Sequence, residues 1–141
     1  MRRFLFLMTI IQASIFALNN CGNYKHLTSQ TEALFRDKWI LMEVGGQQVP
    51  DSLSSTFEFT PGRISGSTGC NRLTAGFVAG KHQTVTFTPE PPTKTDCANE
   101  NAAKLESRFM DALSKSTNWD IRGGVLWLGD GTTTLIKLKS L

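Results

Sequence analysis

Residues 56–66 read TFEFTPGRISG, and this stretch decides the fold class. Thr56 to Phe59 alternates polar and aromatic side chains, which is the pattern of a strand with one buried face. Thr60-Pro61-Gly62-Arg63 then has proline and glycine at positions that suit a tight turn, and it leads into Ile64-Ser65-Gly66. The stretch therefore predicts a β-hairpin that packs on a hydrophobic core.

Strand patterns continue on both sides of this hairpin. Upstream, KWILMEV at residues 38–44 is a strand pattern that Gly45-Gly46 breaks. Downstream, short runs rich in β-formers are separated by glycine turns, except where three prolines make residues 89–96 a loop. The downstream strands are expected at 73–78, 85–87, 119–121, 125–127 and 135–138, the last three as a meander.

Residues 99–115 change to a helical period. Apolar side chains fall on one face of the expected helix, and two oppositely charged i,i+4 pairs lie on the other. Asp96 or Asn99 is placed to cap the helix start. The sequence thus predicts an α+β fold, a curved antiparallel sheet or partial barrel with one long helix packed against it. The apolar face consists of Ala102, Leu105, Phe109, Ala112 and Leu113.

The N-terminus has the pattern of an export signal. Arg2 and Arg3 precede an apolar run from Phe4 to Leu18, too short for a comfortable membrane span. Cys21 just past this run resembles the lipobox of bacterial lipoproteins. We therefore expect a lipoprotein signal peptide at 1–20 and lipidation of Cys21. The alternatives are a buried N-terminal helix or membrane anchor, and ordinary secretion with Cys21 as a leftover thiol.

The remaining chain divides into two parts in this interpretation. Residues 21–36 are mixed and polar and suit a tether, with one helical turn near Thr31–Phe35. Residues 37–141 form the single domain that this length allows.

Cysteine usage agrees with export. The chain has three cysteines, so lipid on Cys21 leaves Cys70 and Cys97 as an even pair. In an oxidising compartment a Cys70–Cys97 disulfide is the default expectation. The competing interpretation is a reactive or metal-binding thiol pair. No C-x-x-C motif is present, and neither His26 nor His82 lies at zinc-ligand spacing from a cysteine, so no metal site is predicted.

Charge and composition exclude several classes of function. The formal net charge is +3, and two of the 15 basic residues lie in the expected leader, which leaves 13 against 12 acidic residues. Such a balance is no nucleic-acid footprint. A composition of 40% hydrophobic and 19% charged residues excludes a disordered chain.

The sequence contains no recognisable catalytic motif. It lacks a nucleophile elbow, a P-loop, a dinucleotide fingerprint, an EF-hand loop and an H-E-x-x-H motif, and it has only two histidines. We therefore predict no enzyme activity and no cofactor. Trp39, Trp119 and Trp127 are expected in the core.

The segment Gly69-Cys70-Asn71-Arg72 resembles the G-C-N-R core of the META domain (HslJ-like) family. The order of other elements is similar too, over about residues 37–139. A W-x-L strand precedes the F-x-F…G-R-I-S-G hairpin, a second cysteine follows at position 97, and a glycine-led strand comes after the helix. These elements are Trp39-Ile40-Leu41, residues 57–66, Thr93–Cys97 and Gly123–Leu128.

The resemblance implies an α+β fold with a curved antiparallel sheet and one helix. It implies no agreed reaction, an association with envelope or stress tolerance, and lipoprotein character in many members. The residues themselves favour a structural staple at Gly69–Arg72. Gly66 and Gly69 allow a sharp turn, Asn71 can bond local backbone, and Cys70 ties the turn to the loop before the helix. A binding surface formed by the same loop is the alternative.

The functional expectation is a lipid-anchored module of the bacterial cell envelope, at the outer membrane on its periplasmic side or surface. Its partners would be the membrane, through the N-terminal lipid, and an envelope protein or a hydrophobic small molecule; no nucleic acid is expected. One alternative is a carrier with an apolar cavity between helix and sheet. It requires that Leu105, Phe109 and the tryptophans leave that space open. Another is an enzyme that uses His82 or a carboxylate pair.

Overall fold

A computed structural model describes residues 31–53, 55–92 and 97–141. The leader expected at 1–20, the expected lipidation site Cys21 and the expected tether as far as residue 30 lie outside these ranges. Within them, no helix is both long enough and apolar enough to span a membrane. The elements are β1 (Lys38–Val44), β2 (Gln47–Gln48), β3 (Thr56–Thr60), β4 (Arg63–Ser67), β5 (Arg72–Ala79), η1 (Lys81–Gln83), β6 (Val85–Pro89), α3 (Glu100–Lys115), β7 (Asn118–Arg122), β8 (Val125–Gly129) and β9 (Thr134–Ser140).

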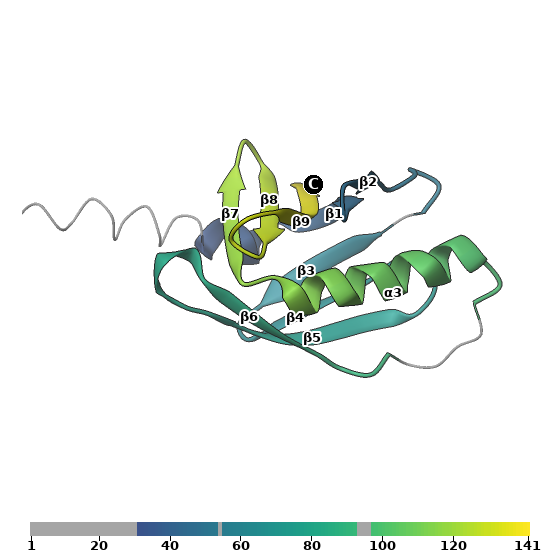
Figure 1. The fold of residues 1–141 in the computed structure, drawn as a ribbon, viewed down its shortest axis with the longest axis horizontal. Coiled ribbons are helices and arrows are strands. Elements are labelled where there is room, and N and C mark those ends of the chain that lie inside the picture. Colours follow the sequence, from purple (N-terminus) through teal and green to yellow (C-terminus); the bar gives the residue numbers. More distant parts are fainter. Residues whose placement is uncertain (1–30, 54, 93–96) are drawn as a thin grey trace, which may run out of the picture. The chain divides into compact units, whose positions relative to one another are not determined.

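The strands form a nine-stranded antiparallel sheet in the order β6-β5-β4-β3-β1-β9-β8-β7, with β2 beside β1. The two end strands meet at one isolated bridge between Thr84 and Asn118, and the amide of Val85 donates to the carbonyl of Thr117 at 2.8 Å. The sheet is therefore a nearly closed barrel, with one long helix packed against it (Figure 1). The predicted α+β class and curved antiparallel sheet are confirmed.

The hairpin at residues 56–67 forms as its sequence predicts. Phe57 pairs with Gly66 and Phe59 with Ile64, and Gly62 turns the chain at φ +78°. Gly66 is required because a Cβ atom there would lie 2.3 Å from Cδ1 of Phe57. The aromatic ring occupies the space over the glycine and faces the core.

The helix α3 begins and packs as the sequence indicates. Asn99 caps it, its Oδ1 accepting from the amides of Asn101 at 3.0 Å and Ala102 at 3.2 Å. All five apolar residues of the predicted face are buried. The ring of Phe109 stacks on Phe57 with centroids 4.4 Å apart, so the helix contacts the decisive hairpin directly.

The compact domain starts earlier than the expected boundary at residue 37. Residues 31–36 are helical, and the compact unit begins at Ala33. Leu34 is 4% exposed and belongs to the core, and its carbonyl accepts a hydrogen bond from Trp39 Nε1 at 3.2 Å. Residues 33–36, expected as the end of the tether, therefore belong to the domain.

The tryptophans do not all lie in the core. Trp39 and Trp119 are buried, as predicted, but Trp127 is half-buried on the outer face of the sheet. The reason is the two-residue period of β8, in which Leu126 and Leu128 take the inner positions. The prediction for Trp127 is wrong because a strand cannot bury three successive side chains on one face.

Candidate functional site

The four motif residues lie where β4 turns into β5. Gly69 adopts φ +97°, a conformation that favours glycine, and its amide donates to Oγ of Ser67 at 3.1 Å. The next residue, Cys70, is joined to Cys97 by a disulfide with its Cα atoms 5.6 Å apart. The loop is thereby attached to the segment that leads into α3.

A second attachment joins the same loop to the helix. The backbone amide of Asn71 donates to Glu106 Oε2 at 3.2 Å, and its Nδ2 donates to Oε1 at 3.0 Å. Asn71 is 7% exposed and Glu106 is 8% exposed. A buried carboxylate requires such donors, because its desolvation is otherwise costly.

These contacts add a partner to one expected residue and reveal one missed residue. Asn71 was expected to bond local backbone, and its side chain also reaches across to Glu106 of α3. Glu106 was not among the residues predicted for the site, although the sequence contains a signal for it. It lies four residues after Ala102 and three before Phe109, and is therefore a charged residue on the apolar face of the helix.

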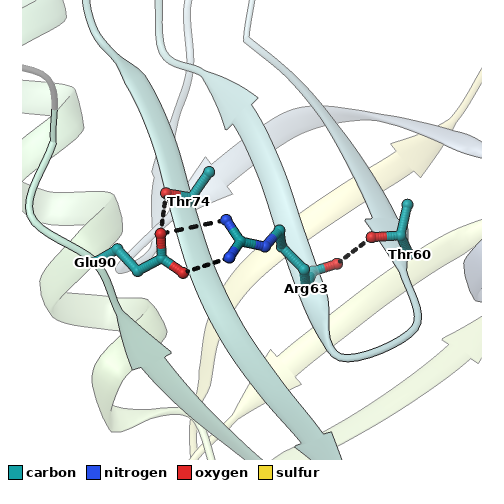
Figure 2. A network of polar contacts seen from close by, with 4 residues as sticks. All are labelled: Thr60, Arg63, Thr74 and Glu90. Carbon is teal, nitrogen blue, oxygen red and sulfur yellow. Dashed lines mark hydrogen bonds and ion pairs between the residues drawn. The ribbon is translucent and has the colours of Figure 1, made fainter.

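The chain between β6 and α3 is also fixed at its other end (Figure 2). Arg63 binds Glu90 through two nitrogens, at 3.3 Å and 3.1 Å, and Thr74 Oγ1 donates to the same carboxylate at 2.9 Å. Thr60 Oγ1 donates to the carbonyl of Arg63 at 3.4 Å. The segment that carries Cys97 thus leaves the sheet from a fixed point on β4 and β5.

A group of possible metal ligands lies where the loop between β4 and β5 meets α3 and the segment before it. Among the described residues, Cys70, Cys97 and Glu106 are the one set of three whose ligand atoms all lie within 4.8 Å of one another. In the disulfide form the two sulfurs are bonded to each other, and Asn71 binds the carboxylate. In this state the arrangement fastens the loop to the helix.

One motif residue faces outward. Arg72 is exposed and lines a shallow groove of about 660 Å³ on the outer face of the sheet. Ser65 and Ser67 of β4 line the same groove, together with Lys38 and Glu58, whose ion pair measures 2.9 Å. In this groove, Arg72 of the motif is exposed to solvent.

The barrel interior is filled. Leu105 and Phe109 are 4% and 1% exposed, and a cavity in the core that neither of them lines measures about 10 Å³. That volume holds about one water molecule at most. Leu34, Phe59, Phe77 and Trp119 are among the residues that close it. Within the described core, the carrier alternative lacks the open cavity that it requires; a cleft of about 390 Å³ that Leu105 lines lies between α3 and the residues that follow β2.

The candidate catalytic groups are not brought together in the described part of the chain. His82 is exposed in η1, and His26 lies outside the described residues. The carboxylate of Asp120 accepts from Gln83 Nε2 at 3.0 Å and pairs with Arg122. The side chain of Asp120 thus contacts an amide and a guanidinium.

One carboxyl group is electrostatically distinct. The amides of Thr133 and Thr132 and the hydroxyl of Thr132 donate to Asp130 and lower the pKa of that carboxyl below its ordinary value. The group is fully exposed in the turn between β8 and β9. It shapes this turn as an ionised acceptor.

Three comparisons relate this geometry to known proteins. A family model described as the META domain matches residues 32–140. A search of the curated proteins finds no significant match. A DUF4847 family protein from Bacteroides vulgatus, solved by crystallography, superposes with a TM-score of 0.59 at 18% identity, covering 77% of this chain and 94% of that one.

Two structures solved by NMR share the same fold. One superposes with a TM-score of 0.59 at 24% identity and covers 77% of this chain and 92% of its own. The other, from Burkholderia xenovorans, has a TM-score of 0.57 at 20% identity and covers 79% of this chain and 86% of its own. These similarities concern the fold alone.

Proposed function

The chain belongs to the META domain family, and on that premise we propose that it is a non-enzymatic interaction module of the bacterial cell envelope. A lipid on Cys21 would hold it at a membrane, in the role in envelope or stress tolerance that its family resemblance implies. The support for the anchor is the order of the N-terminal sequence. Two arginines precede an apolar run that ends at Leu18, and Cys21 follows after two asparagines. Two or three acyl chains give stable attachment where one does not.

One observation carries the proposal of an interaction module. The cavity inside the described core measures about 10 Å³, which favours a partner on the outside of the domain. The fastened loop presents Arg72 there, on a groove of about 660 Å³ that charged, polar and apolar residues line. The disulfide and the Asn71–Glu106 contacts keep this loop in one conformation, which limits the entropy that binding would cost.

The anchor is tested by intact mass spectrometry of the native protein from the membrane fraction. We expect a mass for residues 21–141 plus acyl chains, and no thiol that can be alkylated before reduction. The Cys21→Ser variant should lose both the acyl mass and the membrane fractionation. An unacylated mass with free thiols would overturn the anchor and reopen thiol chemistry as the function.

The interaction surface is tested by photocrosslinking in cells. A photoreactive residue at Ser65 lies in the groove of Arg72, whereas one at Val78 lies elsewhere on the neighbouring strand β5 and is 71% exposed. We expect adducts with an envelope component from Ser65 and not from Val78. Equal adducts from both positions would show contact without a specific surface.

A further inference from the structure

Strand pairing aligns four outward side chains across the sheet. Asp120 of β7 pairs with Trp127 of β8, Trp127 pairs with Lys137 of β9, and Lys137 pairs with Glu43 of β1. Along the row, an acid is followed by an aromatic ring, a base and a second acid. We call these four residues the indole row.

Two cations flank the indole of Trp127. Lys137 Nζ lies 4.8 Å from the ring centroid and Arg122 Cζ lies 5.7 Å from it, both within the range of cation–π attraction. Each cation also has a carboxylate partner. Lys137 binds Glu43 at 2.9 Å with side chains 26% and 12% exposed, and Arg122 pairs with Asp120. The charges around the ring therefore cancel.

A polar cleft of about 310 Å³ adjoins the indole row. Its walls combine a flat aromatic ring with neutral hydrogen-bonding groups and with the charged side chains of Asp120 and Arg122. This volume is at the lower end of the range of small-molecule sites. The walls include Trp127, Arg122, Gln83, Asn118, Thr132 and Thr134.

Two tryptophans that line this cleft have an unsatisfied indole nitrogen. Nε1 of Trp127 and Nε1 of Trp119 are buried and have no hydrogen-bond partner among the described residues. Trp119 itself is only 5% exposed, and it lines both this cleft and the core. Buried N–H donors normally have an acceptor, so these two call for an explanation.

The loop at the rim of the cleft is strained. His82 and Gln83 have φ values of +56° and +61°, although neither is glycine. Such conformations persist where the surroundings enforce them, and they concentrate at ligand sites. Here the strained loop places the amide of Gln83 on Asp120, at the end of the indole row.

We propose that this cleft binds a neutral sugar ring of a glycan. The inference rests on the proposed function, because it names a ligand class for the same interaction module. A pyranose has one apolar face, which suits the indole, and peripheral hydroxyls, which suit amide, hydroxyl and guanidinium groups. The cancelled charges disfavour an anion. Arg122, whose side chain is 72% exposed, can move aside from the ring and donate to the sugar.

The test is a titration of the full-length protein in detergent micelles, with ¹⁵N-labelled tryptophan. The chain has three tryptophans, and the Trp127→Phe variant assigns the indole signal of interest. The probes are three neutral trisaccharides, namely tri-N-acetylchitotriose, cellotriose and maltotriose, and inorganic phosphate as an anion. We expect at least one trisaccharide to shift the Trp127 indole signal and phosphate to leave it unchanged.

Matched variants locate the binding. Trp127→Ala should weaken sugar binding at least tenfold, while Ile40→Ala, which removes an outward apolar side chain from β1, should not change it. An unchanged signal of Trp39, which lies in the core and does not line the cleft, would show that Trp127→Ala is folded. If it is not, Gln83→Ala at the rim serves the same purpose and should weaken binding by several fold.

Three outcomes would overturn the inference. They are no shift with any trisaccharide at millimolar concentration, a shift with phosphate alone, and equal sugar binding by the wild type and the cleft variants. None of them alters the acyl mass or the crosslinks from Ser65. The envelope module could therefore stand while the sugar site fails.

Discussion

Asn71 holds Glu106 by two hydrogen bonds, whereas Cys70 holds Cys97 by a covalent bond. The two neighbouring attachments respond to different conditions. Reduction breaks the disulfide and leaves the hydrogen bonds in place. Substitution of the carboxylate does the reverse, so the contributions of the two attachments can be measured separately.

The disulfide predicts a stability difference that depends on redox conditions. Cys97→Ala should lower the unfolding free energy of the oxidised protein by about 3.5 kcal/mol, because the crosslink no longer restricts the unfolded chain. In reducing buffer the variant and the wild type should unfold at nearly the same temperature. Equal losses in both buffers would show that the sulfur contributes by packing alone.

The buried carboxylate predicts a second difference at residue scale. Glu106→Gln replaces one acceptor oxygen by an NH₂ group that faces a donor on Asn71, so urea unfolding should show a loss of about 1–3 kcal/mol. Glu100→Gln on the same helix is the control. It breaks an exposed i,i+4 pair with Lys104 and should cost about 0.5 kcal/mol or less. Equal losses of unfolding free energy in Glu106→Gln and Glu100→Gln would contradict a stabilising role for the hydrogen bonds between Asn71 and Glu106.

At the scale of elements, the hairpin β3–β4 depends on a glycine opposite an aromatic residue. Phe57 covers Gly66 on one side and stacks on Phe109 of α3 on the other. The glycine therefore lets one ring bridge the sheet and the helix. A glycine is needed here for space and not for backbone conformation, since Gly66 does not have a positive φ.

Two glycines on adjacent strands test this account. Gly66→Ala places a Cβ 2.3 Å from both a ring carbon of Phe57 and the carbonyl oxygen of Thr56, and should destabilise the domain by about 1–3 kcal/mol. Gly76→Ala on β5 has its nearest neighbours at 3.9 Å and should be neutral or slightly stabilising. The prediction is tested by measuring the melting temperatures of both variants. Similar melting temperatures would refute the steric argument.

The sequence predicts the secondary-structure elements better than it predicts which strands pair with one another. Periods of two and of 3.6 residues locate β3, β4 and α3, because each pattern reports a local burial face. The position of β1 between β3 and β9 has no local signal, since it depends on contacts far apart in the chain. Trp127 was misplaced for a related reason: residue type favoured burial, but the alternation of β8 decides which side it faces.

The candidate site was predictable only in part. The pair Cys70 and Cys97 follows from counting, and Gly69 from turn chemistry. Glu106 was visible in the sequence as a charge on an apolar face, but its partner Asn71 lies 35 residues away. The indole row could not be predicted, because it requires the register of four strands.

At the scale of the whole domain, the N-terminal boundary affects stability. A chain of residues 37–141 lacks Leu34, and Trp39 Nε1 loses its acceptor. We expect it to be less stable than residues 33–141 by at least about 2 kcal/mol in urea unfolding. Leu34→Ala in the longer chain should reproduce most of this loss. Equal stability of the two chains would place the boundary at residue 37 after all.

The pairing of β1 with β9 also governs when the domain can form. Lys137 of β9 and Glu43 of β1 meet across 94 residues of the chain. During synthesis, β1 can pair with β3 early, but it can pair with β9 only after every strand between them has been made. The barrel therefore cannot close before β9 is available. Closure is a late step of folding, because the strand that completes the neighbours of β1 is the last one along the described chain.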